Sequence, residues 1–501
     1  MSFRKLALVA LIVLVGASAL AFGSVEDWAA DWQRFGLLLI AAALVASGAS
    51  RRSLGGATGA LLAPVLVIVA LGLIQTVPLP SSAIRVLSPQ WAHLRGLAVA
   101  PGGAEDLPGF LMSKAIAQGT SIQPGAATPR AAAVPAPVDG GRALSVAPLA
   151  TRVALLSWAT AALGLACAAV LARQASDLYT LLWALAGWSG IMGAIAVVTR
   201  VSGTTSLLGL RRAPDGADVL GPFVNPNHFA AFVEVGVLVA FGLLFAILAS
   251  SDGRLTGASI RRALLDRQWA LPRVLLLGGC VVLGLVGLVL SKSRAGSIAF
   301  GIGFLGLVVA RRLKGRFAVL VVAAVCIGIA VGVVSWAGGR GGAGVATPFA
   351  ATSVDPSMSM RWDIWGRTLQ IVKDFPLVGS GLGTFKYVYA GYDRPGEWMS
   401  AIDAHNDYLQ LMAEAGLLGA LALAWAVFAF LRTVVFPLAR PTTPFRWTTA
   451  GCLSAVMAIL IHAVFEFGLQ IPAVALEFSV VVGLLTAVAA EASEGVPKST
   501  E

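Results

Sequence analysis

The segment Asp403–Gly419, DAHNDYLQLMAEAGLLG, places His405 and Asn406 directly before an apolar run, with Glu414 nine residues after the histidine. An imidazole, whose free pKa is about 6.5, is suited to take a proton from an attacking hydroxyl group as a general base. A carboxylate such as Glu414 can orient that base or the helix that carries it. Two structural interpretations stay open: the cluster could cap a helix, since Asn and Asp are favoured at helix N-termini, and Glu414 could be a hydrogen-bond partner inside a helix bundle. The small residues of AGLLGA at 415–420 predict close approach of neighbouring helices.

A second set of residues suited to chemistry is basic. Arg294 stands in SRAG, Arg361 in MRWDIWGRTLQIVKDFPLVGSGLGTF, and Arg211 and Arg212 in LLGLRRAP. Guanidinium groups bind phosphate through a bidentate fork, and preorganised cations stabilise charge that develops on a leaving phosphate. We therefore expect an anionic phosphate ligand at Arg294 and Arg361, with Arg211 and Arg212 as secondary candidates. Alternatively, Arg361 and Arg367 lie on the solvated face of a surface helix, with the nearby tryptophans packed on the membrane.

The composition indicates what must position these residues. Of 501 residues, 57% are hydrophobic and 12% charged, against about 25% charged in soluble domains. Apolar runs long enough to cross a bilayer recur along the chain, which predicts an all-α polytopic membrane protein with about twelve transmembrane helices. The expected helices lie near 5–22, 34–50, 57–77, 151–171, 178–198, 228–250, 274–291, 297–310, 317–337, 406–430, 448–467 and 472–490.

The basic short loops set the expected topology. They are cytoplasmic by the positive-inside rule, which explains much of the net charge of +11 and removes the case for nucleic-acid binding. Both termini are then cytoplasmic. The four cysteines lie in apolar runs without metal-ligand spacing, so we expect neither a metal site nor a disulfide.

The long loops lie on the opposite side of the membrane in this topology. The Pro/Ala-rich loop is expected to be partly disordered, whereas the second long loop carries site residues and is expected to be partly ordered. The predicted segments are helices in 1–77, the Pro/Ala-rich loop 78–150, helices in 151–337, the site-bearing loop 338–405, and helices with a short tail in 406–501.

Ionisable residues inside the predicted helices gather at one depth. Such groups are costly in a membrane and usually pair with one another or serve a site, so we expect a polar cavity near the non-cytoplasmic face. As an alternative, His462 and Glu466, four residues apart, could simply satisfy each other. The residues expected at this depth are His228, Glu234, His405, Glu414, His462, Glu466 and Glu477.

Several motifs together closely resemble the O-antigen ligase and polymerase family. They are SRAG, the segment containing MRWDIWGRTLQ, and HNDYLQLMAEAGLLG, and GPFVNPNHFAAF and HAVFEFGLQIPAVAL are also similar. The resemblance is strongest over roughly 200–480. It implies a bacterial inner-membrane glycosyltransferase with a glycosyltransferase-C-like helical fold and a long periplasmic loop between the ninth and tenth helices.

The same resemblance implies the reaction and its partners. The donor is an undecaprenyl-pyrophosphate-linked glycan, and the acceptor is lipid A-core for a ligase or another lipid-linked glycan for a polymerase. The implied step inverts the anomeric centre at the periplasmic face, without metal or other cofactor, and His405 matches the family's loop histidine. Membrane lipids are expected partners and nucleic acid is not.

Three other interpretations remain: an O-antigen or exopolysaccharide polymerase, a secondary transporter or lipid-linked sugar flippase, and a scaffold for envelope assembly. Transporters often show internal repeats and place ion sites near the membrane midplane. Here the expected charges favour one face and the long loops carry the motifs, which favours transfer over transport. A scaffold leaves the outer arginines unexplained.

Overall fold

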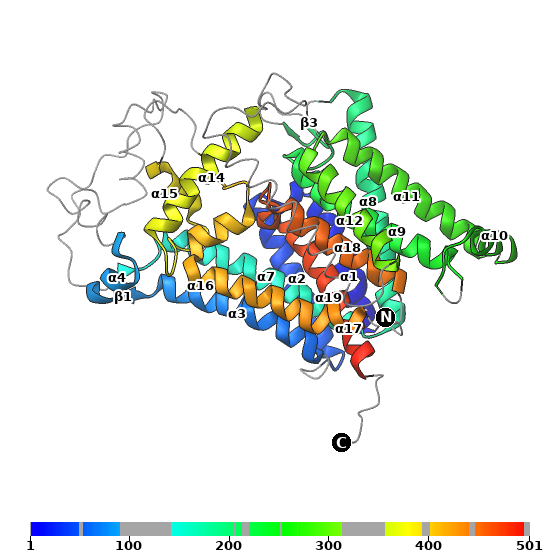
Figure 1. Cartoon of the computed structure of the whole chain (residues 1–501), viewed down its shortest axis with the longest axis horizontal. Coiled ribbons are helices and arrows are strands. Elements are labelled where there is room, and N and C mark those ends of the chain that lie inside the picture. The colour runs from blue at the N-terminus through cyan, green and yellow to red at the C-terminus, as the bar shows by residue number, and fades with distance from the viewer. Residues whose placement is uncertain are drawn as a thin grey trace. The chain divides into compact units, whose positions relative to one another are not determined.

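The computed structural model is helical, with two short strand pairings (Figure 1). It divides into two compact units. Unit 1 comprises Met1–Ala63, Thr160–Val333 and Val427–Glu501, and unit 2 comprises Pro64–Ala159 and Val334–Ala426. The structure describes residues 2–49, 54–90, 142–204, 206–212, 220–250, 253–267, 269–312, 356–392, 401–439 and 446–494.

Among the described residues, nine helical segments are long and apolar enough to cross a membrane, which confirms an all-α polytopic membrane protein. One shorter apolar stretch is Arg294–Val309 of α12, and α18 is a helix of 17 residues. Every expected helix overlaps one in the structure except 317–337, which lies outside the described residues. The nine segments are α1 (Phe3–Leu20), α2 (Asp27–Ala46), α3 (Gly55–Thr76), α7 (Pro148–Leu171), α8 (Ala175–Ser202), α9 (Pro226–Leu248), α11 (Ala270–Leu290), the segment Asp407–Leu438, and α19 (Pro472–Glu494); the other two are α12 (Arg294–Arg312) and α18 (Arg446–His462).

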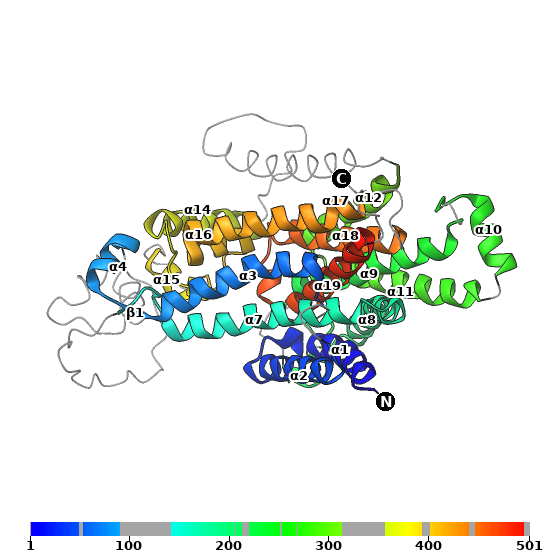
Figure 2. The same ribbon diagram turned by 90° about the horizontal axis from the view of Figure 1, so that it is seen from below.

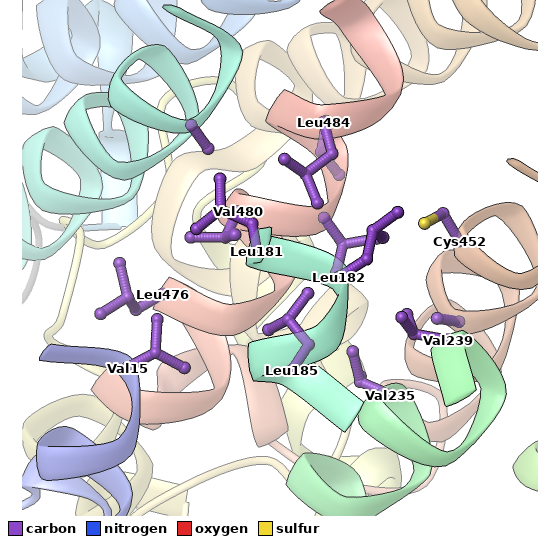
Figure 3. Packing of buried hydrophobic residues seen from close by; sticks show 14 of the residues in the cluster. Val15, Leu181, Leu182, Leu185, Val235, Val239, Cys452, Leu476, Val480 and Leu484 are labelled. Atoms are coloured by element: carbon purple, nitrogen blue, oxygen red, sulfur yellow. The ribbon is translucent and has the colours of Figure 1, made fainter. Parts of the chain in front are cut away.

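Helix α9 is the centre of unit 1 and packs against α8, α11, α12, α18 and α19. Its middle is buried because almost every residue from His228 to Leu243 faces another helix. Glycine permits close approach here: a Cβ at Gly193 of α8 would lie 2.1 Å from the Leu283 carbonyl oxygen of α11. Figure 3 shows this core, in which side chains of three helices interdigitate: Leu181, Leu182 and Leu185 of α8, Val235 and Val239 of α9, and Leu476, Val480 and Leu484 of α19.

Several short elements complete unit 1. Helices α1 and α2 form a hairpin (Figure 2) joined through the 3-10 turn η1 (Phe22–Ser24). The strands β3 (Ser206–Leu207) and β4 (Arg211–Arg212) pair antiparallel. The remaining elements are α10 (Gly257–Asp266), the π-helical turn η5 (Leu431–Val435), α17 (Phe436–Leu438) and the 3-10 turn η6 (Gly468–Gln470).

Unit 2 is built from the second half of α3, the first half of α7, and the helices of the site-bearing loop. Gly72 of α3 faces α7, and a Cβ there would lie 2.6 Å from the Leu155 side chain. The described parts of the long loops contain short elements: β1 (Pro78–Leu79) pairs antiparallel with β2 (Arg142–Ala143). Residues 91–141, where disorder was expected, lie outside the described residues. The other elements are α4 (Ser81–Leu87), α14 (Pro356–Asp374), α15 (Phe385–Tyr389), the 3-10 turn η4 (Ala390–Tyr392) and α16 (Asp407–Phe430).

Helix α16 is interrupted at Gly416, whose φ of 59° and ψ of −152° are not helical. The freed backbone groups pair with the preceding loop: Leu417 N donates to the Pro376 carbonyl at 2.8 Å, and Leu418 N to the Leu377 carbonyl at 3.2 Å. The small residues of AGLLGA therefore admit a loop at Gly416, whereas a neighbouring helix was expected.

Candidate functional site

His405 lies immediately before the cap of α16. The Asn406 side-chain oxygen accepts hydrogen bonds from Tyr408 N and Leu409 N, both at 3.0 Å. Asn406 therefore makes the cap, as the capping interpretation expected of this cluster. The backbone of His405 has a φ of 49°, a left-handed conformation that is uncommon for residues other than glycine.

Both backbone polar groups of Ala404, the residue before His405, are hydrogen-bonded to side chains. Ala404 N donates to the Gln410 side-chain oxygen at 2.9 Å, and the Ala404 carbonyl accepts from the Trp365 indole N–H, also at 2.9 Å. Trp365 belongs to α14, so this contact fixes α14 beside the start of α16. The structure therefore constrains the backbone of His405 from two helices.

Arg361 lies one turn before Trp365 on α14 and on the same face, since residues four apart are neighbours on a helix. Its side chain is half-buried. Because the Trp365 indole bonds the residue preceding His405, the structure brings Arg361 and His405 to the same end of unit 2. This adjacency was not readable from their 44-residue separation in the sequence.

The surface-helix interpretation of α14 is wrong for two of its residues. Arg367 is 7% exposed, forms an ion pair with Asp363, and lies 5.9 Å over the Tyr389 ring. Trp365 is 6% exposed and hydrogen-bonded within the protein. Arg367 thus has partners inside unit 2, because its face of α14 packs against the protein.

Glu414 holds the glycine-rich loop. One carboxylate oxygen accepts from Gly383 N at 2.7 Å, and the other accepts from Phe385 N at 3.1 Å. The carboxylate also lies 3.4 Å from the Gln410 side-chain nitrogen. GSGLGTF therefore wraps a carboxylate of its own chain. Glu414 is 5% exposed and is placed to position the start of α16, to which Gln410 belongs.

Gln75, near the end of α3, is a residue that the sequence analysis missed. Its side-chain nitrogen donates to the Val378 carbonyl at 2.7 Å and to the Glu414 carbonyl at 3.0 Å. Its side-chain oxygen accepts from Leu382 N at 3.0 Å. The available signal was a lone amide in the last turn of an otherwise apolar helix.

The other candidate arginines lie in unit 1. Arg294 begins α12 and is exposed. Arg211 pairs with Glu26 at 2.6 Å and lies 5.6 Å over the Phe22 ring. Arg212 follows it in β4, opposite Ser206. The structure thus brings His405, Glu414 and Arg361 together in unit 2 and describes Arg294, Arg211 and Arg212 within unit 1.

The seven ionisable groups that were expected at one depth also divide between the units, with five of them in unit 1. Helix α18 ends at His462, and the Glu466 amide donates to the His462 carbonyl at 3.1 Å. The His462 ring also contacts Glu234 at 3.1 Å, and the Glu466 side chain accepts from the Asn227 amide at 2.5 Å. Within the described ranges, no group of three or more His, Cys, Asp or Glu side chains is arranged to hold a metal ion.

Part of the chain matches a known family. Residues 279–424 match the family model described as O-antigen ligase. This segment is similar to the O-antigen ligase family. It contains four of the six candidate site residues: Arg294, Arg361, His405 and Glu414.

A curated relative agrees with the O-antigen ligase match. It is a protein of Rickettsia conorii with the provisional name polysaccharide ligase, 29% identical over 237 residues. The match covers 42% of this chain and 57% of the relative, so the chain spans little more than half of that protein's length.

Proposed function

We propose that this chain is a glycosyltransferase of the bacterial inner membrane that moves a glycan from undecaprenyl pyrophosphate to a sugar hydroxyl of lipid A-core, at the periplasmic face. The observation that carries the proposal is the O-antigen ligase match, because it encloses the candidate base and two candidate phosphate-binding arginines. The multi-pass architecture supports a lipid-linked donor, which reaches the enzyme through the bilayer.

The proposed step is a single displacement. His405 takes the proton of the acceptor hydroxyl, and the resulting oxygen nucleophile attacks the anomeric carbon of the donor glycan. The bond from that carbon to the pyrophosphate oxygen breaks, and undecaprenyl pyrophosphate leaves with the electron pair. Attack opposite the leaving group inverts the anomeric centre.

Arginine supplies the positive charge for the leaving group in this mechanism. Arg361 lies on the α14 face that reaches the start of α16, so a pyrophosphate bound there is close to the base. Arg294 at the start of α12 is the second proposed phosphate ligand, and Arg211 and Arg212 are secondary ones. Such preorganised cations act where charge develops in the transition state.

Glu414 and Gln75 act as positioning residues in this proposal. Together they bond five backbone groups: three in the loop at Leu382, Gly383 and Phe385, and the carbonyls of Val378 and Glu414. Fixing this loop against α16 gives His405 a rigid mount. Rigid placement of a base matters because small displacements of reacting groups lower rates steeply.

Reconstitution tests the proposal. Purified protein in lipid nanodiscs would receive a defined undecaprenyl-pyrophosphate glycan and either lipid A-core or a second lipid-linked glycan, with His405→Ala as the inactive control. The expected result is transfer to lipid A-core with release of undecaprenyl pyrophosphate. Growth of the second lipid-linked glycan alone would make the protein a polymerase. Movement of donor across liposome membranes without any transfer would contradict a glycosyltransferase and indicate a flippase.

A further inference from the structure

Three ionisable side chains of unit 1 are buried in membrane-spanning helices and have no part in the proposed transfer. Glu234 of α9 and Glu477 of α19 are 0% exposed, and His462 of α18 is 2% exposed. The His462 ring nitrogen Nδ1 lies 3.1 Å from a Glu234 carboxyl oxygen. Glu477 interacts electrostatically with Glu234. The three groups therefore form one cluster contributed by three helices.

Glu477 is the unusual member of this cluster. Neither of its carboxyl oxygens has a hydrogen-bond partner, and the second Glu234 oxygen has none either. Because Glu477 is 0% exposed, no water-sized space adjoins it. Its sequence neighbour Leu476 points into the apolar core of unit 1 (Figure 3). An ionised carboxylate without water, partner or counter-ion is strongly disfavoured in such surroundings.

Cations do lie near the end of the bundle that holds Glu477: Arg211 packs on Phe22 of η1 and pairs with Glu26, and Arg294 begins α12 next to His462. None of them is hydrogen-bonded to Glu477, whose carboxyl oxygens have no such partner among the described residues. Glu477 is in the second turn of α19, at the end where α18 finishes. Near this end, Glu466 is bonded by Asn227, and the His228 ring packs on Phe467 at 4.6 Å. On α2, which bonds the start of α19 through Gln33, the residues Asp31 and Arg34 pair with each other at 2.6 Å; its remaining charged residue is Asp27, in the first turn.

The other charged residues on elements packed against α19 lie away from Glu477. The η1 end of α1 contacts Ile471, just before α19, so the opposite end of α1 is remote. Only seven residues join α17 to α18, so the turn η5, which precedes α17, and the start of α18 lie at the far end of the bundle. The charged residue of α7 is more than three turns from Gly164, which faces Leu476. These distant residues are Arg4, Lys5, Arg152, Arg432 and Arg446.

We propose that Glu234, His462 and Glu477 form a buried proton-binding site, in which Glu477 is held as the neutral acid beside the Glu234–His462 pair. The charge balance supports this assignment. With both carboxylates ionised and the imidazole protonated, the cluster carries one net negative charge, and one further proton on Glu477 makes it neutral. A metal cation would need several oxygen ligands and space around them, whereas Glu477 is 0% exposed and no group of three or more His, Cys, Asp or Glu among the described residues could hold a metal ion.

The proton site adjoins the helix that carries Arg294. A Cβ at Gly296, two residues after Arg294, would lie 3.2 Å from the His462 ring carbon Cε1. The imidazole is therefore packed against the first turn of α12. The proton site stands independently of the glycan transfer, because its evidence is the burial and charge of unit 1 alone.

Infrared difference spectroscopy on the full chain in nanodiscs tests the site. At neutral pH the unmutated protein should show the carbonyl band of a protonated carboxylic acid, and Glu477→Gln should lose intensity in that band. Glu491→Gln is the matched control, since Glu491 lies on the same helix and is exposed; it should leave the band unchanged. A folded Glu477→Gln protein with the full band would overturn the proposal.

Thermal melting gives a second readout. Glu477→Gln and the apolar Glu477→Leu should melt within about 2–4 °C of the unmutated protein, the shift of a modest change in stability, because each replaces a neutral group. If the unmutated protein showed no protonated-carboxyl band at neutral pH, the proton-binding site would be ruled out, even if both variants failed to fold. A sodium-dependent rise in melting temperature that requires Glu477 would replace the proton by a metal cation.

Discussion

At the scale of single residues, the backbone of His405 is the unusual feature of the candidate site. Its left-handed φ is imposed by Asn406, which caps α16, and by the two hydrogen bonds to Ala404. Left-handed backbone at a residue other than glycine costs about 1–3 kcal/mol and often occurs at functional sites. If only the cap mattered, Asn406 would suffice and glycine would suit position 405 better. The strain therefore supports a function for the imidazole.

His405→Gly separates these two roles. Glycine adopts a positive φ without strain, so the variant should melt at or above the temperature of the unmutated protein. Turnover in the reconstituted transfer should fall by about two to four orders of magnitude, the usual contribution of a general base. A stable variant that transfers glycan at the normal rate would leave His405 without a catalytic role.

The two arginines of α14 should respond differently to lysine. Arg361→Lys keeps the charge but loses the bidentate fork, so transfer should fall sharply while the melting temperature changes little; Arg361→Ala should lose most of the activity. Arg367→Lys should lower the melting temperature, because Arg367 is buried between Asp363 and Tyr389. Arg294→Lys should behave like Arg361→Lys. Full activity of both the Arg361→Lys and Arg294→Lys proteins would contradict bidentate pyrophosphate binding.

At the scale of elements, the interruption of α16 organises the site. Gly416 lets the segment from Pro376 to Gly381 pair with the helix backbone, and Glu414 and Gln75 hold the rest of the loop. Without the interruption, the Leu417 and Leu418 amides would bond within the helix and the loop would lose these partners. Backbone geometry therefore requires glycine at position 416.

Gly416→Ala should destabilise the protein strongly. The φ and ψ of Gly416 lie in a region that is essentially restricted to glycine, and an added Cβ would lie 2.6 Å from the Leu377 carbonyl oxygen. Strain and overpacking together should cost roughly 2–4 kcal/mol, measured as a lower melting temperature. Gly366→Ala on α14 is the control, because a Cβ there meets nothing within 4 Å; it should stabilise by about 0.5–1 kcal/mol. Equal effects of the two substitutions would show that the interruption is not required.

At the scale of the whole molecule, membrane orientation decides which residues meet the donor. The positive-inside rule predicts that His405, Arg294 and Arg361 face the periplasm, while Arg262 and Arg312 face the cytoplasm. The orientation of each of these five residues can be tested separately, because they lie on different loops or helix ends.

Impermeant thiol labelling of intact cells measures this orientation. Single cysteines beside each of the five residues would be placed in a background lacking Cys167, Cys280, Cys326 and Cys452. Labelling should occur beside the first three residues and appear beside Arg262 and Arg312 only after the cells are opened. Labelling beside Arg312 from outside would invert the orientation.

The Pro/Ala-rich loop should be dispensable in part. Its middle, about 100–142, lacks the apolar content to build a core, and a deletion confined to about 100–138 spares β2. Such a deletion should leave β1 and β2 intact, since Pro78 pairs with Ala143 and Leu79 with Arg142. The shortened protein should insert normally and keep measurable transfer. Normal expression with no transfer would show that the loop contributes to the site or to acceptor binding.

The sequence by itself determined the helical membrane architecture, because apolar runs of membrane length report burial in lipid directly. Its short motifs also indicated the segment that matches the O-antigen ligase model. The site roles of His405, Glu414, Arg294 and Arg361 stay predictions. The start of α16 was predicted within one residue, because Asn and Asp mark helix N-termini.

The tertiary structure alone decided which polar groups meet. His462 pairs with Glu234, which is 228 residues away in the sequence. Gln75 reaches Glu414 across 339 residues. Helical spacing describes only neighbours on one helix, so it cannot reveal a partner on another helix or the turn that ends α18. Contacts between segments that are distant in the sequence depend on how the helices pack. Packing therefore decided that Glu234 has a hydrogen-bond partner and that Glu477 has none among the described residues.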